Sequence, residues 1–228
     1  MNASSLPNIR ADVSPSLAGI DGLSAAVADV TTGAGTLAES FAALMDNHLF
    51  QDAVVALANG MTKEAAVKWS VEAAKTVADK LPDGELQALE AAEDWLASGG
   101  AADAGPLQDL LQDNAMQGPG AWAAKAADWS DQAAASDAIA PYGKAVEAAV
   151  KLAAALTASD WPLSESAASE AAEAGVDGMS AMQQELAAGD VDAGAVSDAA
   201  GDGPTPEQQL NDLLKPFVEQ GLKIAAGE

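Results

Sequence analysis

The 228-residue chain has no cysteine. Disulfide bonds, thiol nucleophiles, thiolate zinc sites and iron–sulfur clusters are therefore excluded. Histidine, arginine and tyrosine occur once each, as His48, Arg10 and Tyr142. A catalytic triad would have to use His48, and no Gly-x-Ser-x-Gly elbow accompanies it. We interpret His48, which lies beside a predicted helix junction, as a capping or surface residue.

Basic residues are scarce. Ten lysines and arginines stand against 35 aspartates and glutamates, which gives a net charge of −25. This charge argues against a nucleic-acid backbone or an anionic membrane as a partner. Three explanations stay open: a surface adapted to high salt, a protein partner with a basic or apolar surface, and mimicry of a nucleic acid.

Long hydrophobic runs are also missing. No apolar stretch approaches the length of a membrane-spanning helix. The first residues lack the basic and apolar regions of a signal peptide, because the polar residues Asn8, Arg10 and Asp12 come early. We expect a cytoplasmic protein, or one that a specialised machine exports or assembles without a signal peptide.

Motifs for phosphate, nucleotide and metal chemistry are absent from the sequence. It has no phosphate loop, no dinucleotide fingerprint and no Glu-x-x-His of a ferritin-like site. A calcium-loop-like start at Asp190 lacks its closing glutamate, because Gly201 stands there. Glu90, Glu93 and Asp94 cluster on one predicted helix, but such carboxylates are mostly solvated. We expect no enzyme activity, no catalytic residue, no cofactor and no metal.

Good helix formers, above all alanine, leucine and glutamate, dominate the chain. The sequence therefore predicts an all-α fold, arranged as an irregular helical bundle or as a short stack of helical hairpins. Nine residues are Phe, Trp or Tyr, so each bulky side chain should supply much of the buried area. We expect the core to be built on Trp69, Trp95, Trp122, Trp129, Val146 and Val150.

The stretch from Gly118 to Ser130 (GPGAWAAKAADWS) opens a predicted helix with a Gly-Pro-Gly break. Its two tryptophans are seven residues apart, so two helical turns place them on one face. Small residues fill the rest of that face and allow another helix to approach closely. A further helix over 142–158 is apolar on nearly every side, which predicts a central position beside the helices of Trp69 and Trp122.

Composition divides the chain into five parts. We expect residues 1–35 to form a partly ordered N-terminal arm and residues 36–162 to form a helical core domain. We expect residues 163–188 to form an acidic helical extension. The next residues, 189–203, are rich in alanine, glycine and aspartate and are expected to form a flexible acidic linker. For residues 204–228 we expect a C-terminal amphipathic helix.

The C-terminal helix starts with Thr205-Pro206, a typical helix opening, and carries an apolar stripe that Pro216 is expected to kink. An amphipathic helix after a linker either docks on its own body, which is the commoner outcome, or binds another protein. The residues that would bind a partner are Leu210, Leu213, Leu214, Phe217 and Ile224.

Four motifs between about residues 52 and 155 resemble, in order and spacing, an uncharacterised family of bacterial helical proteins, a domain of unknown function. They are EAAVKW at 64–69, ALEAAEDWL at 88–96, GPGAWAAKAADWS at 118–130 and VEAAVKLAAA at 146–155. The resemblance implies a helical body and an association with contractile, type VI-like secretion loci. It implies no active site and does not extend to the acidic region after Pro162.

These features favour a non-enzymatic protein–protein interaction protein: a scaffold, an adaptor or a chaperone-like accessory of a secretion system or another macromolecular assembly. The alternative is a structural component or cargo of a multi-copy particle, in which the chain would form a homo-oligomer. A carboxylate-dependent hydrolase is the least favoured interpretation.

Overall fold

The computed structural model describes residues 6–100, 118–132, 142–158 and 206–228. The regular elements in these ranges are all helices, so the all-α prediction is confirmed. One isolated antiparallel bridge joins Ile9 to Met61. The elements are α1 (Ala25–Val30), α2 (Leu37–Asp46), α3 (Phe50–Gly60), α4 (Lys63–Lys75), the 3-10 helix η1 (Ala78–Lys80), α5 (Asp83–Ala97), α7 (Pro119–Gln132), α8 (Tyr142–Ala158) and α11 (Pro206–Ala225).

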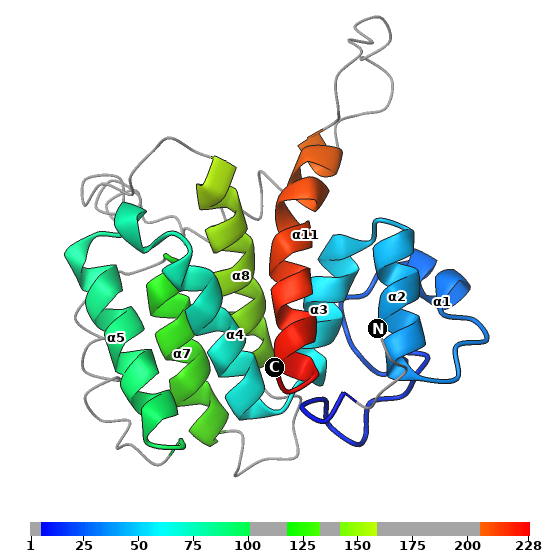
Figure 1. Ribbon diagram of the computed structural model, residues 1–228, viewed down its shortest axis with the longest axis horizontal. Helices are drawn as coiled ribbons and strands as arrows, with labels where there is room; N and C mark the ends of the chain where they lie inside the picture. Colours follow the sequence, from blue (N-terminus) through cyan, green and yellow to red (C-terminus); the bar gives the residue numbers. More distant parts are fainter. Residues whose placement is uncertain (1–5, 101–117, 133–141, 159–205) are drawn as a thin grey trace, which may run out of the picture.

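Helix α8 lies in the middle of the bundle (Figure 1). It packs against α3, α4, α7 and α11, so the prediction that it contacts the helices of Trp69 and Trp122 is confirmed. Helix α5 covers α4 and α7 at one side of the molecule, while α1 and α2 lie at the other side beside α3 (Figure 1). The chain therefore places α5 at an edge, with its outer face away from the other helices.

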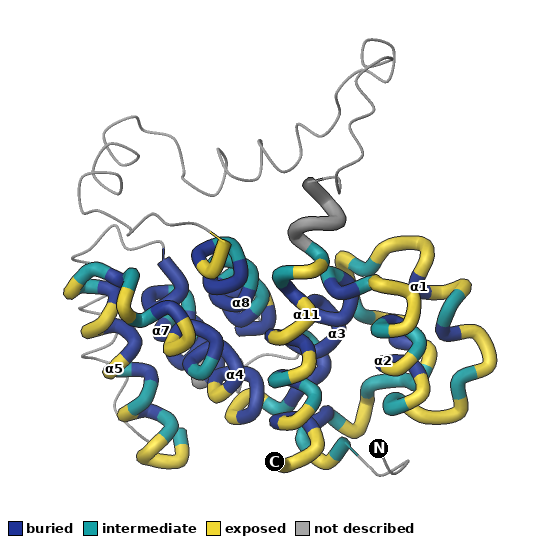
Figure 2. The backbone as a smooth tube through the Cα atoms, turned by 45° about the horizontal axis from the view of Figure 1, so that its top comes forward, coloured by how far each residue is buried: buried dark blue, intermediate teal, exposed yellow. Residues whose placement is uncertain are grey.

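The core runs through the contact between these helices, where buried residues line their inner faces (Figure 2). Trp69 and Trp95 are fully enclosed, at 0% and 1% exposed. Val146 and Val150 of α8 are completely buried as well. Because large side chains are few, these two indoles supply much of the buried apolar area.

Trp122 and Trp129 differ from the expectation. Both are half-buried and pack against the edge of the core rather than inside it. Helix α7 meets α4, α5 and α8 through alanines such as Ala123 and Ala127, which are 0% exposed. Close approach of three neighbours leaves room only for small side chains on that side, so the indoles occupy the outer rim.

Helix starts follow local chemistry. Thr36 caps α2 in a capping box, because its hydroxyl accepts from the Glu39 N–H and the Glu39 carboxylate accepts from the Thr36 N–H. Thr62 precedes α4 in extended conformation, without a side-chain cap bond. Asp83 is the first residue of α5, and Pro82 holds the cap position.

The N-terminal segment, expected as an arm, packs on the body over its described part, residues 6–35. Ile9, Leu17 and Val27 are buried in the common core. Asn8 joins distant parts of the chain: its N–H donates to the Ala225 carbonyl (3.1 Å), and its side-chain amide donates to the Ile224 carbonyl (2.7 Å). These bonds satisfy carbonyls at the end of α11 that have no partner within the helix.

Helix α11 docks on its own body, between α3, α4 and α8. Of the two alternatives for its apolar stripe, the structure shows the docked one: Leu214, Phe217 and Ile224, named above as candidates for partner binding, are at most 5% exposed. Leu213 is half-buried and packs against the same core. The docking is specific as well as apolar, because the Trp69 indole N–H donates to the Phe217 carbonyl at 3.0 Å.

The remaining predictions for the C-terminal third have different outcomes. Helix α11 runs without a break from Pro206 to Ala225, through Pro216. The acidic extension at 163–188, the linker at 189–203 and the side chain of Leu210 lie outside the described residues.

Candidate functional site

Glu85 is the centre of the contact between α5 and α7. Its side chain is 4% exposed, and its two carboxylate oxygens accept from the main-chain N–H groups of Gly118 (2.8 Å) and Ala121 (2.7 Å). The first N–H groups of a helix have no partner within that helix and carry partial positive charge. A carboxylate from α5 thus satisfies the start of α7.

The two glycines of the Gly-Pro-Gly break make this contact sterically feasible. A Cβ atom on Gly118 would lie 2.7 Å from the Glu85 carboxyl carbon. One on Gly120 would lie 3.0 Å from the Glu85 carbonyl carbon and closer still to the carbonyl oxygen. The break therefore serves less to end a loop than to let the start of α7 lie directly on α5.

Burial raises the pKa of the Glu85 carboxyl group, although the N–H groups of Ala121 and Gly118 and the charge of Lys125 act against the shift. Burial also lowers the pKa of the Lys125 ammonium group, and Glu85 opposes that change. The Lys125 Nζ atom lies 4.1 Å from the centre of the Trp122 ring, a cation–π contact. These partners make Glu85 an internal helix cap that joins two helices.

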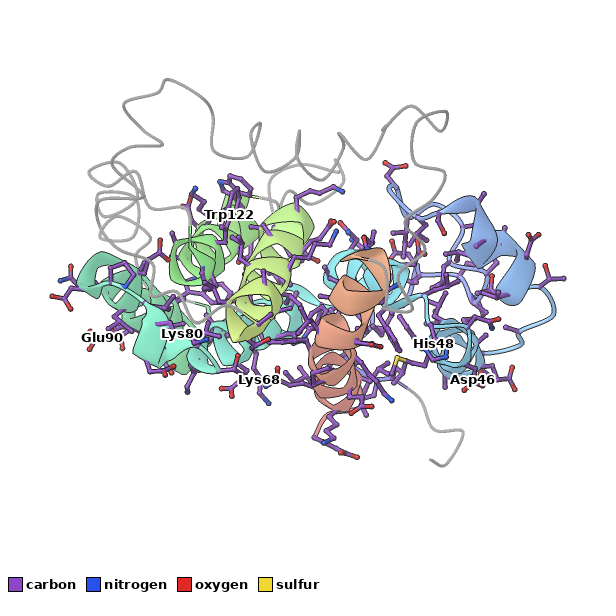
Figure 3. All side chains as sticks on the ribbon, turned by 90° about the horizontal axis from the view of Figure 1, so that it is seen from above. Asp46, His48, Lys68, Lys80, Glu90 and Trp122 are labelled. Carbon is purple, nitrogen blue, oxygen red and sulfur yellow. The ribbon has the colours of Figure 1, made fainter. Side chains whose placement is uncertain are left out.

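The exposed side of α7 is aromatic. Trp122 and Trp129 meet edge to face, with their ring centres 6.2 Å apart. Figure 3 shows Trp122 at the rim of the bundle, pointing away from the other helices. The sequence predicted that the two indoles share a face, and they do; it did not indicate that the face is the outer one.

Most basic side chains of the protein are engaged within the chain. Lysines of α4 and η1 donate to main-chain carbonyls in the last turns of other helices: Lys63 to Ser130 in α7 (3.5 Å), and Lys80 to Leu156 in α8 (2.6 Å). A cation at that end of a helix interacts favourably with its dipole. Eight of the ten basic residues make a hydrogen bond to a carbonyl, an ion pair or a cation–π contact within the chain: Arg10, Lys63, Lys68, Lys75, Lys80, Lys125, Lys144 and Lys151.

The outer face of α5 is acidic. Asp83, Glu90 and Asp94 are exposed on it, and the helix has no basic residue. Leu86 lies among them and is 37% exposed. Helical periodicity places these four residues in one stripe. Figure 3 shows Glu90 at the side of the molecule opposite to His48.

A shallow groove of ≈ 530 Å³ lies between α4, α5 and the end of α11. Aliphatic side chains form its floor: Ala65, Val71, Leu96 and Ile224. Charged side chains stand along it: Glu64, Lys68, Glu72 and Glu93. The groove and the acidic face of α5 are adjacent, because α5 borders both. The groove could not be predicted from local sequence patterns, since its residues come from distant parts of the chain.

The residues weighed for catalysis are placed apart. His48 is exposed between α2 and α3, and its ring meets the Phe50 ring edge to face, at 5.7 Å between ring centres. Glu93 pairs with Lys75 at 2.8 Å. Among the described residues, no group of three or more histidines and carboxylates is arranged to hold a metal ion. No helix in the described ranges is both long and apolar enough to cross a bilayer.

Comparison with known proteins identifies the family of this chain. The model of DUF6931, a family of unknown function, matches residues 40–179, which is more than half of the chain. The chain belongs to this family. The match begins in α2 and ends before α11, so the N-terminal segment and the C-terminal helix lie outside it. Neither the curated proteins nor the solved structures give a match.

Proposed function

We propose that the chain is a non-enzymatic interaction protein that binds a protein partner with a basic surface. It would act as a scaffold, adaptor or chaperone-like accessory in a secretion system or another macromolecular assembly. The observation that carries the proposal is the distribution of charge. Eight of the ten basic residues have internal contacts, and none of the ten lies on α5, so the exposed carboxylates of its outer face are available to cations of a partner.

The geometry of α5 supports this role. Its inner face is held by α4 and α7, and Glu85 fixes its orientation through α7. A rigid helix displays its surface charges in fixed positions, which favours electrostatic steering of a partner of opposite charge. The exposed Leu86 adds an apolar contact at the middle of the stripe.

Point substitutions on α5 test the proposal. Removal of residues 206–228 would uncover Trp69 and the core, so it would report on folding instead of binding. The double substitution Glu90→Gln/Asp94→Asn removes two exposed charges of α5. Asp46→Asn/Glu219→Gln removes two exposed charges from other helices and serves as the matched control.

The measurement is affinity capture from extracts of the source cells, at low and at physiological salt, with retained proteins identified by mass spectrometry. We expect the wild type and the control to retain the same basic protein and the α5 variant to lose it. Retention should weaken as salt rises, because exposed charges are screened over about 8 Å at physiological ionic strength. Equal retention by both double variants would contradict the proposal.

A further inference from the structure

The outer face of α7 places a lysine between two indoles. Lys125 follows Trp122 by one helical turn and precedes Trp129 by another, so the three side chains lie on one face. The Lys125 Nζ atom is 4.1 Å from the centre of the Trp122 ring, and the two indole rings meet edge to face. All three residues are half-buried, so the amine has aromatic surroundings and is still within reach of a reagent from solvent.

Lys125 differs from the other half-buried lysines in its contacts. Nine of the ten basic residues are lysines, all nine lie in the described ranges, and three of them are half-buried. Of these three, Lys80 donates to a main-chain carbonyl of α8 at 2.6 Å, and Lys151 donates to the Glu147 carboxylate at 2.7 Å. Within the described part of the chain, the Lys125 ammonium group has neither a hydrogen bond nor an ion pair, and it faces an aromatic ring instead.

Burial has a chemical consequence for this amine. It lowers the pKa of Lys125, and the charge of Glu85 opposes the shift without cancelling it. The missing acceptor acts in the same direction, because an ammonium group that leaves water without a hydrogen-bond partner is disfavoured relative to the neutral amine. A larger share of Lys125 than of a fully hydrated lysine is therefore neutral, and the neutral amine is the nucleophile.

We infer that Lys125 is a modification site that accepts an acyl group from an activated donor, a thioester or an acyl phosphate. In the reaction, the Nζ lone pair forms a bond to the carbonyl carbon, and the bond from that carbon to the sulfur or to the phosphate oxygen breaks. The thiolate or the phosphate leaves with the electron pair, and Nζ loses a proton to water. The product is a neutral amide, which removes the half-buried charge. The inference is independent of the partner proposed above.

The other lysines lack one part of this combination. Lys75 is exposed and paired with Glu93, whose hydrogen bond raises the pKa of the ammonium group. Lys215 and Lys223 of α11 are exposed, so water hydrates their ammonium groups. Acylation should therefore favour Lys125 over lysines that are easier to reach.

The test follows acetylation of each lysine in the full chain, with acetyl coenzyme A as the thioester and acetyl phosphate as the acyl phosphate in separate reactions. The faster of the two reagents identifies the class of donor. Digestion after aspartate and glutamate places Lys125, Lys215 and Lys223 in separate peptides, so mass spectrometry gives a rate for each. The two exposed lysines of α11 serve as internal references.

Two variants separate activation of the amine from simple access to it. Trp122→Ala removes the ring beside Nζ. Met45→Ala is the matched control, because it shortens another half-buried side chain, in α2 at the other side of the molecule. Circular dichroism verifies that both variants are folded.

We expect Lys125 to be acetylated about threefold or more faster than Lys215 and Lys223 near neutral pH, because more of its amine is neutral. The rate should also rise at a lower pH for Lys125 than for the references, a difference that access alone does not produce. In Trp122→Ala, water reaches the amine, so the Lys125 rate should fall to within about twofold of the references. Met45→Ala should leave it unchanged. In protein isolated from the source cells, acyl occupancy should be higher at Lys125 than at the references.

Three results overturn the inference. The first is a Lys125 rate no higher than that of the reference lysines, or a dependence on pH that coincides with theirs. The second is a Lys125 rate that rises in Trp122→Ala, since the indole would then shield the amine instead of activating it. The third is an acyl occupancy at Lys125 in the cellular protein that is no higher than at Lys215 and Lys223.

Discussion

Replacement of Gly120 by alanine tests the contact between α5 and α7 most directly. The new Cβ atom would lie 3.0 Å from the carbonyl carbon of Glu85 and closer still to the oxygen. The obstacle is main chain inside a helix, which cannot rotate aside as the end of a side chain can. The start of α7 must therefore move away from α5, and the hydrogen bonds from Gly118 and Ala121 to the Glu85 carboxylate lengthen with it.

The loss of stability in Gly120→Ala is partly offset by the gain that a glycine-to-alanine replacement usually brings. Glycine to alanine inside a helix normally stabilises by about 0.5–1 kcal/mol. Overpacking costs about 1–3 kcal/mol, and a buried polar group that loses its partners costs about 1–3 kcal/mol more. After the usual gain is subtracted, we expect the free energy of unfolding to fall by about 1–5 kcal/mol, a large share of the stability of a typical domain.

Urea unfolding followed by far-ultraviolet circular dichroism measures this loss. Gly60→Ala is the matched control, because it lies in α3 and its Cβ would come no closer than 3.7 Å to any neighbour, an ordinary contact. The control should be neutral or more stable by up to about 1 kcal/mol. A Gly120→Ala protein as stable as the wild type would refute the proposed close contact of α5 and α7.

Three further outcomes are expected. Trp69→Phe removes the donor to the Phe217 carbonyl and should lower the free energy of unfolding by about 1–2 kcal/mol in urea titrations, more than Trp129→Phe at the half-buried rim. Burial raises the pKa of Glu85 above 4.5, so the folded chain binds this proton more readily than the unfolded chain. The free energy of unfolding should therefore rise as the pH falls through the folded pKa and level off below 4.5. Unfolding measured at several pH values should show a smaller rise for Glu85→Gln than for the wild type. With a net charge of −25, the melting temperature should increase with sodium chloride, and a decrease would contradict adaptation to salt.

The helical class and the centre of the bundle could be predicted because they depend on local pattern. The apolar faces around Val146 and Val150 can only be buried among other helices, and the structure places them there. The burial of Trp69 and Trp95 follows from the same logic, since the chain has few other large side chains. Local pattern also indicated that Trp122 and Trp129 share a face.

Long-range features could not be predicted in this way. Glu85 looks like any other glutamate in a helix, and only the start of α7, more than thirty residues later, makes it a buried cap. The glycines on both sides of Pro119 were the available signal, because two glycines at a helix start suggest close approach as well as a turn. The groove likewise joins Asn8, α4, α5 and Ile224, which no local pattern connects.

The apolar stripe of α11 was ambiguous for a different reason. A stripe shows that a helix needs a partner surface, but it does not show whether that surface belongs to the same chain. The deciding residues are Trp69 and Gly221: the indole bonds to α11, and a Cβ at Gly221 would lie 2.8 Å from the indole ring. This fit between a tryptophan and a glycine is visible only in three dimensions.

The position of α11 has a consequence for how the chain reaches its native state. The bond from Trp69 to Phe217 spans 148 positions, and that from Asn8 to Ile224 spans 216. During synthesis, the surface around Trp69 stays uncovered until α11 leaves the ribosome. Such distant contacts slow folding, since a large loop must close before they form. Completion of the fold therefore waits for α11, and a chain interrupted before this helix exposes the hydrophobic surface that chaperones recognise.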